Sequence, residues 1–158
     1  MIWVYLHIVT MFAAIGVALG SEIILHRVAG TGEVRSIRTV FGLVKPLEQI
    51  IPALLILGGI LGVVAVLVRE YGFFESWLVQ SYVIFGIAFV LGGAIQGRWI
   101  EKVRQAAESS PDDRPSDDLR RLLDDRKARY AFWVIYLALA VVVYIMVIKP
   151  YSYDRGFY

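Results

Sequence analysis

The chain has 158 residues, of which 58% are hydrophobic and 19% are charged, and its mean hydropathy is +0.65. A soluble domain usually carries about 25% charged residues, and here the charges gather between long apolar runs. Cysteine is absent, which excludes disulfides, thiolate catalysis, Cys-ligated zinc and iron–sulfur clusters. The composition therefore indicates one integral membrane domain over residues 1–158.

Four apolar segments are long enough to cross about 30 Å of hydrocarbon, which takes roughly 20 helical residues. They cover about residues 2–25, 47–68, 77–96 and 130–148. Because lipid offers no hydrogen-bond partner to open backbone groups, each segment must be helical. We predict an all-α, four-helix transmembrane bundle. A cleaved signal peptide is the rival interpretation of the first segment, but no basic residue precedes it and its apolar run exceeds the usual 7–15 residues.

The first span carries a polar stripe. At about 100° per residue, one side of this helix collects the polar and small residues, and Gly16 and Gly20 fall on the opposite side. The stripe consists of His7, Thr10, Met11, Ala14, Ala18, Ser21 and Glu22. We expect the stripe to face the interior of the bundle.

Glu22 is the only acidic residue of the first span. It lies about one turn from the end of that span, and Glu48 enters the second span at a similar depth. The favoured interpretation is a structural ion pair or helix-end anchor, with His26, Arg27 or Lys45 as partner. The alternative makes Glu22 and Glu48, with His26 nearby, an inward-facing site for a proton or a cation.

His7 lies about 8 Å inside the other end of the first span. A histidine within the membrane is a functional-site hypothesis by default. Met146 of the fourth span is expected in the same leaflet, whereas His26 is about 28 Å away along the same helix. Haem held by His7 and Met146 is therefore an alternative. We expect the commoner use of a lone histidine, which is a hydrogen bond to a neighbouring carbonyl, and no cofactor.

The loop after the first span contains apolar residues at helical spacing, with basic residues between them. The apolar residues are Val34, Ile37, Phe41 and Val44. We expect a short amphipathic helix on the membrane surface, which joins two spans and attaches to anionic lipid rather than to a protein partner.

The second and third spans contain a proline and two glycine pairs. Pro52 lies inside the second span and predicts a kink near Glu48. Gly58 and Gly62, and Gly93 and Gly97, repeat the GxxxG spacing of Gly16 and Gly20, which allows close helix approach. The six glycines of these pairs are Gly16, Gly20, Gly58, Gly62, Gly93 and Gly97. We expect them to serve packing within the bundle before dimerisation.

The segment between the third and fourth spans, about residues 97–129, is long and polar. "SSPDDRPSDD" breaks the helix with two prolines, and Ser116 is expected to cap a new one. Arg104 and Glu108 are spaced as a helical ion pair. We predict a helical hairpin closed by two apolar faces. The faces are Trp99, Val103 and Ala107 on one side and Leu119, Leu122 and Leu123 on the other.

Lysine and arginine are concentrated in the two loops that follow the first and third spans. The exceptions are Arg69, Lys149 and Arg155. The positive-inside rule then places both loops in the cytoplasm and both termini outside, in a bacterial inner (plasma) membrane. Aspartates are mixed with the basic residues of the second loop, so no clean positive surface for nucleic acid is expected.

The run "YLHIVTMFAAIGVALGSEIILHR", the basic loop, "PALLILGGILGVV" and "SWLVQSY" resemble a bacterial family of predicted integral membrane proteins of unknown function. The resemblance covers about the first 100 residues and implies the four-span shape without a mechanism. A fainter resemblance to copper-resistance D type membrane proteins rests on the early histidine alone.

No nucleophile–base pair, phosphate loop or metal-ligand motif is present in the sequence, so we expect neither an enzyme nor a metal site. The leading hypothesis is a structural or accessory membrane protein, embedded in the lipid bilayer as a homo-oligomer or as a subunit of a larger complex. A small ion or solute carrier using Glu22 and Glu48 is the first alternative. A haem-binding electron-transfer subunit using His7 is the second.

Overall fold

The computed structural model describes residues 1–149, and within them the chain is helical without any strand. Its elements are α1 (Ile2–Ala29), α2 (Val34–Val68), α3 (Ser76–Leu91), the π-helical segment η1 (Gly92–Gly97), α4 (Arg98–Ser109), α5 (Asp117–Leu123) and α6 (Arg126–Ile148). Four helical stretches in this part of the chain are long and apolar enough to cross a membrane. The predicted all-α bundle is therefore confirmed.

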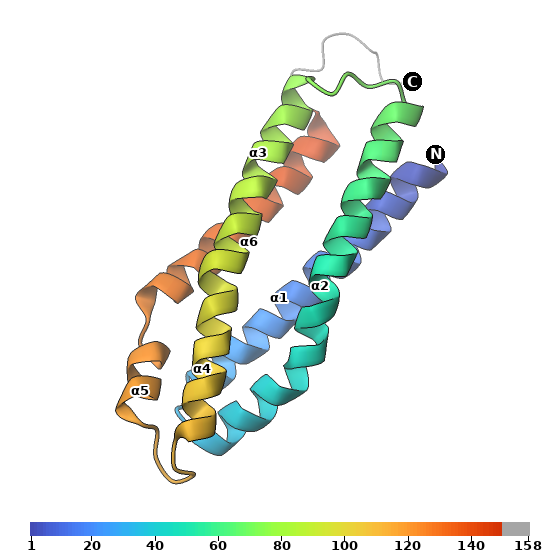
Figure 1. The fold of residues 1–158 in the computed structure, drawn as a ribbon. Coiled ribbons are helices and arrows are strands. Elements are labelled where there is room, and N and C mark those ends of the chain that lie inside the picture. The colour runs from blue at the N-terminus through green and yellow to red at the C-terminus, as the bar shows by residue number, and fades with distance from the viewer. Residues whose placement is uncertain (150–158) are drawn as a thin grey trace.

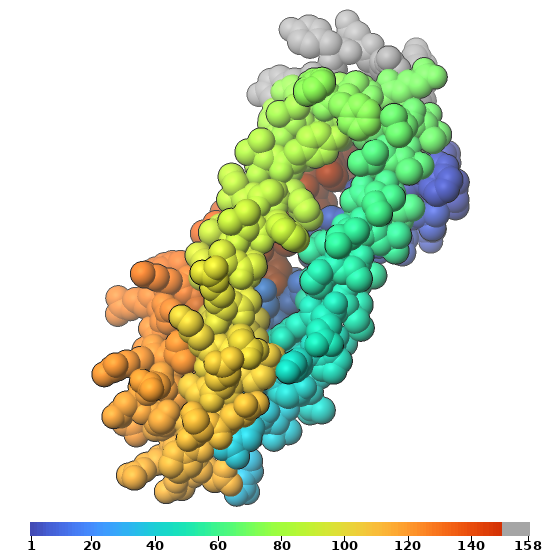
Figure 2. All heavy atoms as spheres, in the orientation of Figure 1, coloured from blue at the N-terminus to red at the C-terminus, as the bar shows by residue number. Residues whose placement is uncertain are grey.

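The four long helices form two antiparallel pairs, α1 with α2 and α3 with α6 (Figure 1). The pairs join at the end that carries α4 and α5, where α2 packs on α4. We call this the hairpin end. The opposite end, which carries Met1, residues 69–75 and Lys149, is called the terminal end. Between the pairs, the space-filling view shows a hollow bordered by α2 and α3 (Figure 2).

Large apolar side chains cover the outside of the long helices. Phe12, Ile56, Val90, Leu137 and Val147 are each more than 60% exposed. A water-soluble protein rarely exposes apolar surface on this scale. In hydrocarbon the same surface needs no cover, because lipid tails are as apolar as the side chains.

The larger of two buried apolar clusters in residues 1–149 lies at the hairpin end, and the smaller one, with Trp77 and Leu78, lies at the terminal end. The larger cluster unites the last turns of α1, the first turns of α2, α4 and α5. Its fully buried members include Leu25, Ile37, Phe41, Val103 and Leu119. The loop after the first span and the helical hairpin before the fourth span, which were predicted as separate features, thus pack together as one unit.

The prediction of a separate amphipathic helix on the membrane surface is wrong. Residues 34–44 are the first turns of α2, which stays helical through Pro46 and Pro52 and curves gently on the way (Figure 1). The apolar residues of this stretch face α1 and α4 in place of lipid. They are Val34, Ile37, Phe41 and Val44, all buried. This apolar stripe therefore packs against other helices of the protein and not against lipid.

The helical hairpin forms as predicted from its two apolar faces. Trp99, Val103 and Ala107 of α4 join Leu119 in the core, and the Trp99 Nε1 donates to the Leu122 carbonyl at 2.8 Å. Ser116 caps α5, since its hydroxyl accepts from the Leu119 amide at 3.3 Å. α5 is only 7 residues long, so it depends on this packing rather than on its own helical propensity.

The connection from α4 to α5 is fastened by an arginine of α2. The guanidinium of Arg38 donates to the carbonyls of Ala107 and Ser110 at 3.1 and 3.0 Å and pairs with Asp112 at 2.8 Å. The last carbonyls of a helix have no partner within the helix and carry partial negative charge. A single cation therefore closes the end of α4 and ties it to α2.

Candidate functional site: an apolar cavity with a few polar groups between the helix pairs

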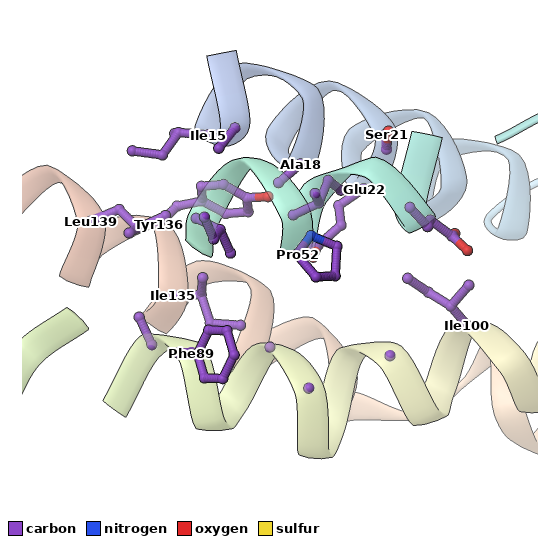
Figure 3. Close-up of a pocket in the computed structure, with 18 of the residues that line it drawn as sticks. Ile15, Ala18, Ser21, Glu22, Pro52, Phe89, Ile100, Ile135, Tyr136 and Leu139 are labelled. Atoms are coloured by element: carbon purple, nitrogen blue, oxygen red, sulfur yellow. The ribbon is translucent and has the colours of Figure 1, made fainter. Parts of the chain in front are cut away.

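A cavity of about 340 Å³ lies between the two helix pairs, with walls from α1, α2, α3 with η1, α4 and α6. Most of its wall is aliphatic or aromatic (Figure 3). The apolar lining includes Ile15, Ala18, Pro52, Phe89, Ile135 and Leu139. The polar groups that reach the cavity are few and stand toward the hairpin end.

Glu22 lines this cavity from α1, as the polar stripe of the first span suggested. The phenol of Tyr136 on α6 lies beside its carboxyl (Figure 3). The Glu22 Oε2 is buried and has no hydrogen-bond partner among residues 1–149, and the same holds for the hydroxyl of the neighbouring Ser21. A buried polar atom without a partner costs free energy. The wall of the cavity therefore contains unmet hydrogen-bonding capacity.

Glu48, the second predicted carboxylate, is bound by Arg104 of α4. The Arg104 Nη2 lies 2.7 Å from the Glu48 Oε2, and the same guanidinium also binds Glu101. The Arg104 side chain is only 9% exposed. Glu48 is thus neutralised by a short, charge-assisted contact, so Glu22 and Glu48 do not form an unshielded pair of acids.

Arg104 was missed as a site residue, because its spacing suggested an exposed pair with Glu108. That pair is wrong: the ion pairs of Arg104 within residues 1–149 are to Glu48 and Glu101. A signal was present in the sequence. Arg104 follows Ile100 by four residues and precedes Ala107 by three, so it falls on the apolar face of its helix. A charged side chain in an apolar stripe is costly to bury unless it is paired with an opposite charge.

The ion-pair partners expected for Glu22 are not found. No ion pair among residues 1–149 involves His26, Arg27 or Lys45. The His26 ring instead stacks on Trp99, with ring centroids 4.4 Å apart and planes 10° apart. His26 therefore packs against Trp99 at the hairpin end and does not line the cavity.

A buried amide lies beside the His26 ring. The Gln96 side chain donates to the Ala128 carbonyl at 2.7 Å, which links η1 to α6. The Gln96 Oε1 and the His26 Nε2 are both buried without a partner among the described residues. The hairpin end thus holds a second group of unsatisfied polar atoms, separate from Glu22.

His7 packs at the α1–α2 contact. Its Nδ1 lies 2.7 Å from the Gly58 carbonyl oxygen, and a Cβ added to Gly62 would come within 2.9 Å of its ring. Met146, its proposed companion for haem, belongs to a different cluster at the terminal end, with Trp77 and Leu78. The structure does not bring the two side chains together in a shared cluster, and haem at His7 stays a prediction.

The three glycine pairs differ in what surrounds them. A Cβ on Gly58 would meet the Met11 sulfur at 2.5 Å, and Gly62 is covered by His7, so this pair receives α1. A Cβ on Gly16, Gly20 or Gly93 would meet nothing within 4 Å. Gly97 would meet only the Gly92 carbonyl of its own turn, at 3.6 Å. One pair of the three therefore lies in a helix–helix contact, and Gly93 and Gly97 border the cavity instead.

One family model matches nearly the whole chain. The family model described as "Predicted integral membrane protein (DUF2269)" matches residues 1–150. The match extends well past the first 100 residues on which the resemblance was noticed. No curated protein and no solved structure matches the chain, and the fainter resemblance to copper-resistance D type proteins finds no support.

Proposed function

The chain belongs to the DUF2269 family of predicted integral membrane proteins, and from this premise we propose that it is a membrane carrier of small, lipophilic cations. Glu22 provides the counter-charge in the cavity between the helix pairs. The observation that carries the proposal is the buried, unpartnered oxygen of Glu22, a residue that lines a cavity of about 340 Å³. An ionisable residue within a membrane span is a functional-site hypothesis by default.

The cavity favours an organic cation over an inorganic one. Its volume lies at the lower end of the range for small-molecule sites, about 300–1,000 Å³. Ca²⁺ takes six to eight oxygen ligands. This cavity offers the Glu22 carboxyl, the Tyr136 phenol and the Ser21 hydroxyl within an apolar wall, and its other charged residues, Glu48, Glu101 and Arg104, are already paired with one another. An amine or quaternary ammonium with an apolar body satisfies both kinds of surface. A proton on Glu22 would compete with such a cation for the same carboxyl.

The arrangement of the helices supports a carrier. α1 packs on α2 and α3 packs on α6, and the two pairs meet mainly at the hairpin end. Alternating access in carriers commonly moves one helix group against another around a central site. The Glu48–Arg104–Glu101 cluster closes the cavity toward the hairpin end, so it is the contact that such a movement would have to open.

The proposal modifies the carrier expected from the sequence, because Glu22 acts without Glu48 as a partner. The expectations of an accessory role, of an oligomer or larger complex, and of a non-enzymatic chain stay predictions. The concentration of Lys and Arg at the hairpin end supports a cytoplasmic location of that end in the inner membrane. Arg155 and the rest of residues 150–158 lie outside the described part.

The test is equilibrium binding of tetraphenylphosphonium, a lipophilic cation, to the purified protein in detergent, measured by calorimetry. We expect binding to the native chain, weakened at acid pH by proton competition, and loss of binding in Glu22→Gln. Glu108→Gln is the matched control, since Glu108 is an exposed α4 residue outside the cavity. Absence of binding to the native chain, or equal binding to Glu22→Gln, would overturn the proposal.

A further inference from the structure

A second hollow, of about 240 Å³, lies at the hairpin end, where η1 and α4 face the turn between α5 and α6. It shares no residue with the cavity that contains Glu22. Its floor is held by the Trp99 side chain, whose Nε1 donates to the Leu122 carbonyl at 2.8 Å. The hollow is therefore a feature of the packed hairpin and not of the gap between the helix pairs.

Three cationic side chains line this hollow, and one acid accompanies them. The cations are Arg98, Lys102 and Lys127. None of them takes part in an ion pair within residues 1–149. The acid, Asp125, is engaged locally, because its Oδ1 accepts from the Lys127 amide at 2.8 Å and caps α6. The hollow thus carries three cations against one carboxylate, an excess of positive charge.

The hollow stands at the depth where the apolar spans end. Ala94 and Ile95, at the end of the third span, form its apolar side. On the neighbouring α6, Tyr130 and Trp133 are 68% and 65% exposed. Tyrosine and tryptophan concentrate at the headgroup level of a bilayer. A ligand here therefore meets hydrocarbon on one side and three cations on the other.

We propose that this hollow binds the headgroup of an anionic phospholipid. The phosphate oxygens would be held by Arg98, Lys102 and Lys127, with the acyl chains lying along Ala94 and Ile95. Arginine and lysine are the side chains that recognise phosphate in proteins, and basic pockets at helix ends bind anionic headgroups. A free phosphate ion has the charge but no apolar part to match the second surface, so the lipid is the better fit.

The experiment measures lipid retained by the purified protein in native mass spectra, with phosphatidylglycerol compared with phosphatidylcholine. The variant Arg98→Gln/Lys102→Gln/Lys127→Gln should bind phosphatidylglycerol roughly tenfold more weakly or worse. The matched control, Arg114→Gln/Arg120→Gln/Arg121→Gln, removes the same charge from exposed positions outside the hollow. It should retain the lipid as the native chain does.

Three results would overturn the proposal. Equal weakening in both triple variants would mean general attraction to the basic hairpin. Retention of phosphatidylcholine equal to that of phosphatidylglycerol would mean that the site does not recognise the headgroup charge. Displacement of the lipid by an equal concentration of inorganic phosphate would identify a free-anion site instead. Glu22→Gln should retain the lipid, which keeps this site separate from the proposed carrier site.

Discussion

Single charged side chains are decisive in this molecule, because so few of them lie within the bundle. Arg104 shows how far sequence reasoning reaches at this scale. Its position in the apolar stripe of α4 foretells burial, but the partner, Glu48, is 56 positions away and belongs to another helix. Sequence spacing describes neighbours on one helix, whereas a contact between helices depends on how the helices are docked.

Breaking this ion pair should destabilise the protein. Arg104→Met leaves the partly buried Glu48 carboxylate without its cation, and breaking such a pair costs about 3 kcal/mol of unfolding free energy or more. The double variant Arg104→Met/Glu48→Leu should recover part of the loss, because the partly buried carboxylate is removed with its cation, and the other partner, Glu101, is 49% exposed. Thermal unfolding in detergent measures both, with Arg120→Met as the exposed control. An unfolding midpoint for Arg104→Met equal to that of the control would contradict the assignment.

At the scale of helices, the apolar spans were predictable and their contacts were not. The sequence places α1, α3, α6 and the end of α2 to within a few residues, since a span must be long and apolar enough to cross the hydrocarbon. It does not say that α2 begins at Val34 instead of about residue 47, because Pro46 is a usual helix breaker. Nor does the GxxxG spacing say which glycines receive a neighbour, since lipid and helix surfaces are equally apolar.

Substitution by alanine should distinguish the glycines that lie in a helix–helix contact from those that do not. Gly62→Ala puts a Cβ within 2.9 Å of the His7 ring, and overpacking of this kind costs about 1–3 kcal/mol. Gly16→Ala meets open space and gains helical propensity, so it should leave stability unchanged or raise it. Unfolding midpoints of the two variants, measured side by side in detergent, check this. Equal destabilisation by both would show that the exposed pair also has a neighbour.

For the whole molecule, the sequence predicts the class of fold and its two chemically different ends. The charge difference between the ends is a property of composition, so it is readable without coordinates. The cavity between the helix pairs could not be predicted from the sequence. It arises because α1–α2 and α3–α6 each pack as a unit, and residual space between two packed units depends on their docking and not on any local pattern.

The orientation of the molecule can be tested with single cysteines, because the native chain has none. Asp113→Cys lies in the loop at the hairpin end and Glu70→Cys in the loop at the terminal end. If the hairpin end is cytoplasmic, a membrane-impermeant maleimide should label Glu70→Cys in intact cells and should label Asp113→Cys only after lysis. The opposite labelling pattern would reverse the proposed topology.

The π-helical segment Gly92–Gly97 should determine where a single-residue deletion in this helix is tolerated. A π-turn accommodates one residue more than an α-turn, so a deletion within it can be absorbed by reversion to a regular helix. Elsewhere between Ser76 and Arg104, loss of one residue would rotate the helix downstream of it by about 100°. Arg104 would then swing away from Glu48. Changes in helix length should therefore be tolerated at this glycine-rich turn and rejected on either side of it.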